Sequence, residues 1–100
     1  MRGWRSSGLK TTDAAIMAKP GLFGGLFVLT DGVNAATAVA YDNASAASGL
    51  ELGKLVVPGA TLFGQQIPPS LGVYCQNGIY VDMTVGGGGS MSYFVWYDPL

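Results

Sequence analysis

The 100-residue chain has no histidine, one cysteine and few charged side chains. Without histidine it cannot form a Ser/His/Asp or Cys/His triad, because these triads need a base that titrates near neutral pH. Its single cysteine, Cys75, cannot form an internal disulfide, and alone it is no zinc ligand set. We therefore expect a protein that is not an enzyme, that holds no metal ion or cofactor, and in which Cys75 fills space in the core.

Charge is scarce along the whole chain. Charged residues make up 11% of the sequence, against about 25% in ordinary soluble domains, and 49% of the residues are hydrophobic. One hundred residues form one small domain, and with so little charge its surface includes apolar area that a partner would cover. The composition predicts self-association or binding to another protein.

The first twenty residues hold most of the positive charge. Four of the five basic side chains lie there: Arg2, Arg5, Lys10 and Lys19. With one acidic residue the net charge of residues 1–20 is +3, against −4 for the remainder. Four scattered cations are too sparse for a nucleic-acid-binding patch, so we expect them to lie against an acidic protein neighbour.

Few large apolar side chains and no strong turn signal occur in this segment, so we expect residues 1–20 to form an extended arm. Trp4, between two arginines, offers one large ring that could anchor the arm on a neighbour. The alternative is a disordered segment with an exposed tryptophan. We predict partner contacts through the four cations, Trp4 and, from the last strand, Trp96.

A membrane span is not expected. The longest apolar stretch, residues 14–29, is interrupted by Lys19 and Pro20 and falls short of the roughly 18 to 20 apolar residues that cross a bilayer. Polar residues also follow the basic start of the chain, where a secretory signal needs an apolar region.

Alternation with period two, punctuated by Gly, Pro, Asn and Asp, indicates short antiparallel strands. We expect strands at 22–29, 35–41, 50–57, 61–67, 72–75, 79–85 and 91–100. In the last of these, Tyr93, Val95 and Tyr97 share one face, and Phe94 and Trp96 share the other. The predicted fold is all-β: a single antiparallel β-sandwich or jelly-roll-like barrel over residues 21–100, preceded by the arm.

Two connections stand out. Asn77-Gly78 is the strongest hairpin signal in the chain and predicts that the strands on either side pair with each other. The segment GGGGS, residues 86–90, looks like a flexible linker, but an alternating aromatic segment follows it. We interpret these glycines as a mobile hairpin tip between the last two strands.

Sequence motifs for chemistry are weak. GLELGKL, residues 49–55, has the Gly-Lys of a phosphate-binding loop, but its glycines are too close together and Leu55 replaces the Ser or Thr that holds magnesium. A calcium site made of Asp31, Asp42 and Asp82 remains an alternative if these residues lie at strand ends, although no segment matches a calcium loop. Asn43-Ala44-Ser45 fits the glycosylation pattern, but Asn43 is more simply explained as a turn residue.

Two segments carry a resemblance to a known group of proteins. TDGVNAATAVAYDNASAASG, residues 30–49, and QNGIYVDMTVGGGGS, residues 76–90, resemble small virion proteins of tailed bacteriophages. The resemblance covers roughly residues 21–97, and its motifs are turn and strand patterns, not chemical signatures.

The resemblance implies a non-enzymatic structural protein located in the virion. It would be a β-sandwich that decorates the capsid, binds the major capsid protein and forms homotrimers, or else a neck, tail or head-fibre subunit. The residues leave open a third reading, a carbohydrate-binding module that uses Tyr41, Tyr80, Tyr93 or Trp96 as a stacking platform.

Overall fold

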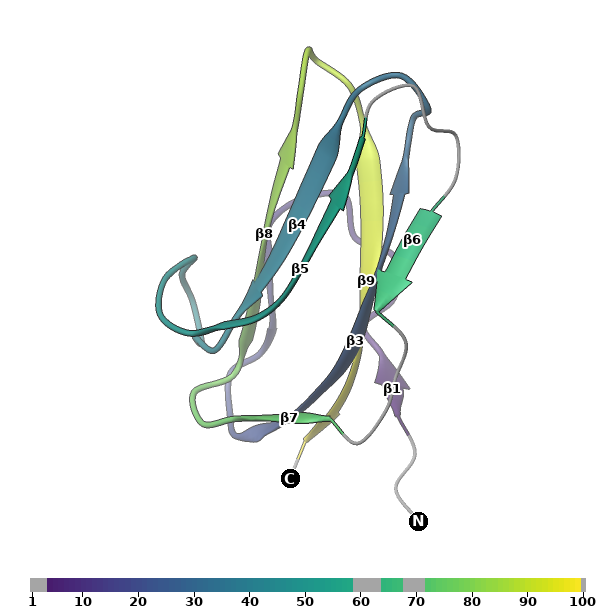
Figure 1. The fold of residues 1–100 in the computed structure, drawn as a ribbon. Helices are drawn as coiled ribbons and strands as arrows, with labels where there is room; N and C mark the ends of the chain where they lie inside the picture. Colours follow the sequence, from purple (N-terminus) through teal and green to yellow (C-terminus); the bar gives the residue numbers. More distant parts are fainter. Residues whose placement is uncertain (1–3, 59–63, 68–71, 100) are drawn as a thin grey trace.

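A computed structural model describes residues 4–58, 64–67 and 72–99, which form two antiparallel β-sheets packed face to face (Figure 1). Within these residues there is no helix long and apolar enough to cross a membrane. The strands are β1 (Arg5–Ser6), β2 (Ala14–Met17), β3 (Gly21–Thr30), β4 (Ala36–Tyr41), β5 (Glu51–Val57), β6 (Gly64–Ile67), β7 (Val73–Cys75), β8 (Ile79–Val85) and β9 (Met91–Pro99).

One sheet, the β9 sheet, has the strand order β1-β9-β3-β6, and β7 also pairs with β3. β6 pairs with residues 26–29 of β3 and β7 with residues 21–23, so these two short strands share one edge of β3. The other sheet, the β8 sheet, has the order β2-β8-β4-β5. With β6 and β7 taken as one interrupted strand, this is the strand order of a jelly roll. The predicted all-β sandwich is confirmed.

Alternation along the strands places the core between the sheets. The expected division of β9 into two faces is correct, and the face with Tyr93 and Val95, which are fully buried, is the inner one. On β4 the small alanines face inward, and Ala36, Ala38 and Ala40 join the same buried cluster. Small side chains on β4 leave room for the larger ones from the opposite sheet.

The predicted strands match the observed ones within about two residues wherever the structure describes them. Positions 61–63 of one expected strand, and Leu100 at the end of the last, lie outside the described residues.

The segment expected as an arm is extended, and it runs along the edges of both sheets. β1 pairs with β9, and β2 pairs with β8. Between them Lys10 makes an isolated bridge to Tyr93 through two backbone hydrogen bonds. These residues pair with strands more than sixty positions away, which local turn signals could not indicate.

The predicted Asn77-Gly78 hairpin is wrong. β7, before the turn, pairs with β3 in the β9 sheet, whereas β8, after it, pairs with β2 and β4 in the β8 sheet. The turn crosses between sheets and is held by Asp42, whose carboxylate accepts the Gln76 and Asn77 amides at 3.2 and 2.8 Å. A tight turn therefore does not pair its flanking strands here.

The glycine segment 86–90 likewise joins strands of opposite sheets, so the expected hairpin between the last two strands is also wrong. The segment packs against residues 31–35: the Gly86 amide donates to the Ala35 carbonyl at 3.0 Å, and the Ser90 amide donates to Asp31 at 2.9 Å. A Cβ at Gly89 would lie 2.5 Å from atoms of Asp31 and Asn34. A side chain at that position would force Asp31 or Asn34 to move.

Candidate partner-binding surfaces

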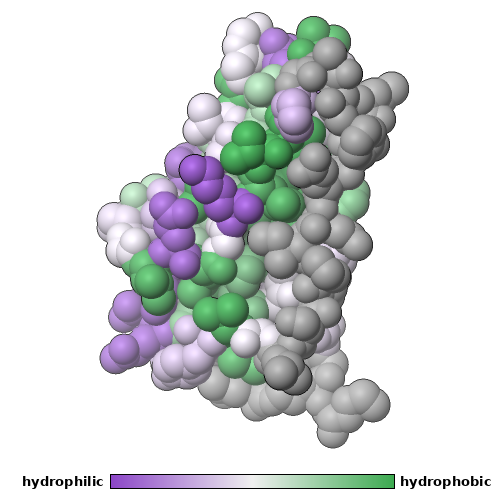
Figure 2. Space-filling view, viewed as in Figure 1, coloured by the Kyte–Doolittle hydropathy of each residue, from purple (hydrophilic) through white to green (hydrophobic). Residues whose placement is uncertain are grey.

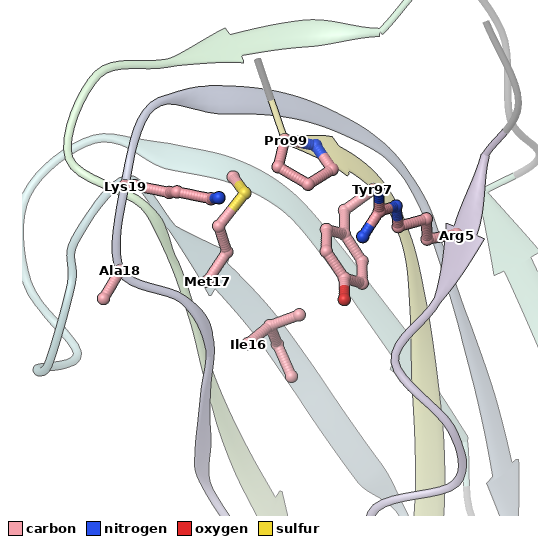
Figure 3. A pocket seen from close by; sticks show the side chains of 7 residues that line it. All are labelled: Arg5, Ile16, Met17, Ala18, Lys19, Tyr97 and Pro99. Atoms are coloured by element: carbon pink, nitrogen blue, oxygen red, sulfur yellow. The ribbon is translucent and has the colours of Figure 1, made fainter.

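A pocket of about 340 Å³ opens where the β1 edge of one sheet faces the β2 edge of the other (Figure 3). Its lining residues are Arg5, Ile16, Met17, Ala18, Lys19, Tyr97 and Pro99. The neighbouring edge strands are short, two residues for β1 and four for β2, so they leave this side of the sandwich open. The pocket is a gap between two sheet edges.

The side chains of this pocket combine an apolar wall with two cations. Met17 is buried, and the Tyr97 ring lies beside it with its hydroxyl directed toward Ile16 (Figure 3). The exposed Lys19 and Arg5 side chains reach toward the middle from opposite sides (Figure 3). Within the described residues neither cation forms an ion pair. The pocket therefore suits a group that carries negative charge next to apolar atoms.

Among the residues that the structure describes, no carboxylate side chain lines this pocket. Asp98 follows Tyr97 in β9, but strand alternation turns its side chain to the opposite face of the sheet, level with Leu22. Asp98 has an interaction of its own.

Aromatic side chains gather on the outer face of the β9 sheet. Phe27 and Phe94 stack with their ring centroids 5.0 Å apart, and Trp96 meets Phe94 edge to face at 4.9 Å. The Trp4 indole packs over Gly24 and Gly72, since a Cβ at these positions would lie 2.6 and 2.8 Å from its ring. All four aromatic side chains are half-buried, so Trp4 packs against its own domain.

A smaller hollow of about 270 Å³ lies at the far end of the same sheet, next to residues 9–11 and 90–92. Two exposed leucines line it, Leu9 and Leu29. Surface apolar patches also interrupt the hydrophilic ones on the side of β4 and β5 (Figure 2). This mixture fits the expectation, from the low charge content, of a surface with contiguous apolar area.

The structure separates the six predicted partner-binding residues. Arg5 and Lys19 meet at the pocket, whereas Trp4 and Trp96 lie on the outer face of the β9 sheet. Lys10 is at neither place, and Arg2 lies outside the described residues. Sequence patterns did not indicate the apolar wall, because Ile16, Met17 and Tyr97 come from strands of different sheets that pair with remote segments.

The loop 42–50, DNASAASGL, is closed by hydrogen bonds of its own side chains. Asn43 accepts the Ser45 and Ala46 amides at 2.9 and 3.0 Å, and its amide group donates to the backbone and hydroxyl oxygens of Ser48. The Asp42 amide donates to the Leu50 carbonyl at 2.8 Å. The expected turn role of Asn43 is confirmed, and the loop presents Leu50, which is 65% exposed, and then Glu51.

The aromatic residues proposed as a carbohydrate platform do not share one surface. Tyr93 is in the core and Trp96 is on the β9 sheet. Tyr41 and Tyr80 are direct cross-strand neighbours on the outer face of the β8 sheet, and both are half-exposed. Of the four aromatic residues, only these two share one outer face.

The three aspartates considered for calcium make different contacts. Asp31 and Asp42 accept backbone amides of neighbouring loops, and Asp82 lies beside Asp13 on the β8 sheet. Burial, and then hydrogen bonding to Asp13, raises the pKa of Asp82. No cluster of three or more potential metal ligands occurs within the described residues.

Cys75 is fully buried, and its thiol donates to the Gly21 carbonyl at 3.2 Å. Burial, and then the nearby negative charge of Asp42, raises the pKa of Cys75 to about 11. The expected role of Cys75 as a core residue is confirmed, and a protonated thiol of this kind is a poor nucleophile.

No protein-family model, curated protein or solved structure matches this chain. Function is therefore inferred from the surfaces and from the sequence resemblance.

Proposed function

We propose that this chain is a non-enzymatic structural protein of a phage virion, most simply a decoration protein that binds the lattice of the major capsid protein. One structural observation supports it above others. The two segments that carry the resemblance, residues 30–49 and 76–90, form a single unit, because β4 pairs with β8 along its whole length.

Each end of this unit is closed by an aspartate. At one end Asp31 accepts the amides of Val33, Asn34 and Ser90, and at the other Asp42 accepts those of Gln76 and Asn77. These motif residues hold loops in place. That role suits a protein that functions by adhesion, because the shared sequence pattern then reflects the needs of the fold and not of a chemical site.

Adhesion also fits the surface. Exposed large apolar side chains occur at several places on the domain: Leu9, Leu29, Val33, Leu50, Val56, Val73 and Tyr74. A subunit that binds only the assembled shell stabilises it by mass action, by about 2.7 kcal/mol per site when its free concentration is a hundred times Kd. In this proposal the protein forms homo-oligomers on the virion surface and needs no cofactor.

The test is to count copies of the chain against the major capsid protein in purified particles, and then to strip the chain and heat the shells. Hundreds of copies and a lower temperature of shell failure after stripping support decoration. About a dozen copies would move the protein to the neck, tail or a vertex. Absence from particles would contradict the virion assignment.

A second candidate, a glycan-binding module, is favoured by the Tyr41 and Tyr80 pair alone. Aromatic side chains on a flat sheet face can stack on sugar rings. Tyr41→Ala and Tyr80→Ala would then abolish retention on a glycan array. A native chain that binds no glycan would leave this candidate without support.

A further inference from the structure

The chain itself carries a segment that is chemically complementary to the pocket between β1 and β2. The pocket needs a negative charge next to apolar atoms, because Arg5 and Lys19 flank a wall made by Ile16, Met17 and Tyr97. Where the loop between β4 and β5 ends, the exposed Leu50 is followed by the exposed Glu51, the first residue of β5. The Glu51 carboxylate makes no hydrogen bond or ion pair within the described residues.

We propose that the pocket of one copy of this chain receives Leu50 and Glu51 of a second copy. The Glu51 carboxylate would lie between the two cations, and the Leu50 side chain would cover the apolar wall. This inference names the surfaces of self-association and rests on the proposed function only in that the protein acts as a homo-oligomer.

The two surfaces lie at opposite edges of the same sheet. Ala15 of β2 pairs with Tyr80, Tyr80 with Tyr41, and Tyr41 with Glu51, so one cross-strand row runs from the strand beside the pocket to Glu51. Three strand spacings of about 4.8 Å separate the ends of this row, roughly 14 Å. A contact between two different surfaces is a heterologous one, which builds a ring when the rotation closes.

Loop 42–50 is suited to present this contact. The Asn43 hydrogen bonds close the loop, and the Asp42 amide fixes the Leu50 carbonyl at 2.8 Å. Gly49 adopts a φ of 96°, a left-handed conformation, and Leu50 follows it immediately before β5. A loop that is ordered before binding loses less entropy when it docks.

The edge of β5 itself is a poorer interface. Its pairing with β4 is interrupted by a bulge between the partners of Ala40 and Tyr41, and it carries the exposed Lys54. Bulges and lysines on edge strands oppose strand addition. The contact is therefore expected through side chains of Leu50 and Glu51, without a continuous sheet between copies.

Sedimentation velocity of the purified chain over a range of concentrations tests the proposal. We expect concentration-dependent association that Glu51→Lys weakens at least tenfold, and that the double variant Arg5→Glu, Lys19→Glu weakens equally. Lys54→Glu is the matched control, because it reverses an exposed cation on β5 outside the pocket. Mixing Glu51→Lys with the double variant should restore association, since residue 51 of each variant is then opposite in charge to the pocket of the other.

A peptide provides a second measurement that does not depend on complete assembly. A capped peptide of residues 48–53, SGLELG, should shift the methyl resonance of Met17 and the ring resonances of Tyr97, and a version with Gln in place of Glu should not. A native chain that stays monomeric at millimolar concentration, or association that Glu51→Lys leaves unchanged, would overturn the inference.

The outcomes also separate this inference from the proposed function. A monomeric chain that is still found in hundreds of copies on particles overturns only the contact. An oligomer that responds to the charge reversals but is absent from particles overturns only the virion assignment.

Discussion

The phenolic hydroxyl of Tyr93 donates a hydrogen bond of 2.6 Å to the backbone carbonyl of Thr12. Tyr93 belongs to β9, and Thr12 lies just before β2 of the β8 sheet. The Tyr93 side chain therefore reaches from one sheet toward the other. The backbone of Tyr93 also exchanges hydrogen bonds with Lys10 at 2.7 and 2.9 Å. One residue thus fixes the crossing of the N-terminal segment from one sheet to the other.

Tyr93→Phe should lower the free energy of unfolding by about 1 to 1.5 kcal/mol, because it removes one hydrogen bond and leaves the Thr12 carbonyl without that donor. Urea unfolding followed by circular dichroism measures the change. Tyr74→Phe is the control. Tyr74 is exposed, so the loss of its hydroxyl should lower the free energy of unfolding by less than about 0.5 kcal/mol. Equal effects of the two substitutions would contradict the role given to Tyr93.

Burial, and then the negative charge of Asp13, raises the pKa of Tyr93 well above its usual range. A group whose pKa is higher in the folded state stabilises the fold below its unfolded pKa and loses that contribution as the pH rises. Native protein should therefore lose stability above about pH 10. The Tyr93→Phe variant should show a smaller loss in the same melts.

The hydrogen bonds of Asp31 predict that the fold loses stability in acid. Its carboxylate accepts the amides of Asn34, Val33 and Ser90, and these bonds hold the pKa of Asp31 far below its usual range. A lowered pKa stabilises the fold above the unfolded pKa, and the contribution is lost as the pH falls from about 4 toward the folded value. Thermal melts of native protein between pH 6 and 2 should show this loss.

The same melts on Asp31→Asn should begin at a lower Tm and decline less with acid. Lys54→Gln is the control, because it removes an exposed charge that lies in neither loop and should keep the native pH profile. Parallel profiles of native protein and Asp31→Asn would show that Asp31 does not hold the two loops together.

Period-two alternation was enough to predict the all-β fold, most strand positions and the faces of β9. Pairing could not be predicted from local signals. The tight turn at Asn77-Gly78 joins different sheets because Asp42, 34 residues or more away, supplies its hydrogen bonds. The pocket could not be predicted for the same reason. The charges of Arg5 and Lys19 are evident in the sequence, but Tyr97 meets them only through long-range pairing.

The seat of Trp4 on glycines can be tested directly. Gly24→Ala introduces a Cβ that would lie 2.6 Å from the indole ring, so Trp4 must move. In a Trp96→Phe background, tryptophan fluorescence should shift to longer wavelength as the ring becomes more exposed. Gly86→Ala in the same background is the control, because its Cβ would lie 3.8 Å from the nearest atom, the Ala35 carbonyl oxygen. An unchanged spectrum for Gly24→Ala would mean that Trp4 is not seated there.

Cys75 should be unreactive in the folded protein. Its side chain is buried, and its pKa is raised to about 11, so at pH 8 nearly all of it is the protonated thiol. Alkylation by iodoacetamide should be at least a hundredfold slower in buffer than in denaturant, because the thiolate is the reactive form. Mass spectrometry after timed quenching measures both rates. Rapid labelling of native protein at pH 8 would show that the thiol is accessible.

The glycine segment gives a prediction that separates close packing from flexibility. Gly89→Ala places a Cβ 2.5 Å from Asn34 Nδ2 and Asp31 Oδ2, within the hydrogen-bonded loop, whereas Gly86→Ala meets only an ordinary contact. Overpacking costs about 1 to 3 kcal/mol, so Gly89→Ala should lower the free energy of unfolding by that amount and Gly86→Ala by less. If the segment were a free linker, both substitutions would leave the urea midpoint unchanged. A large loss for Gly89→Ala alone would show that the glycines are needed for contact with Asp31 and Asn34.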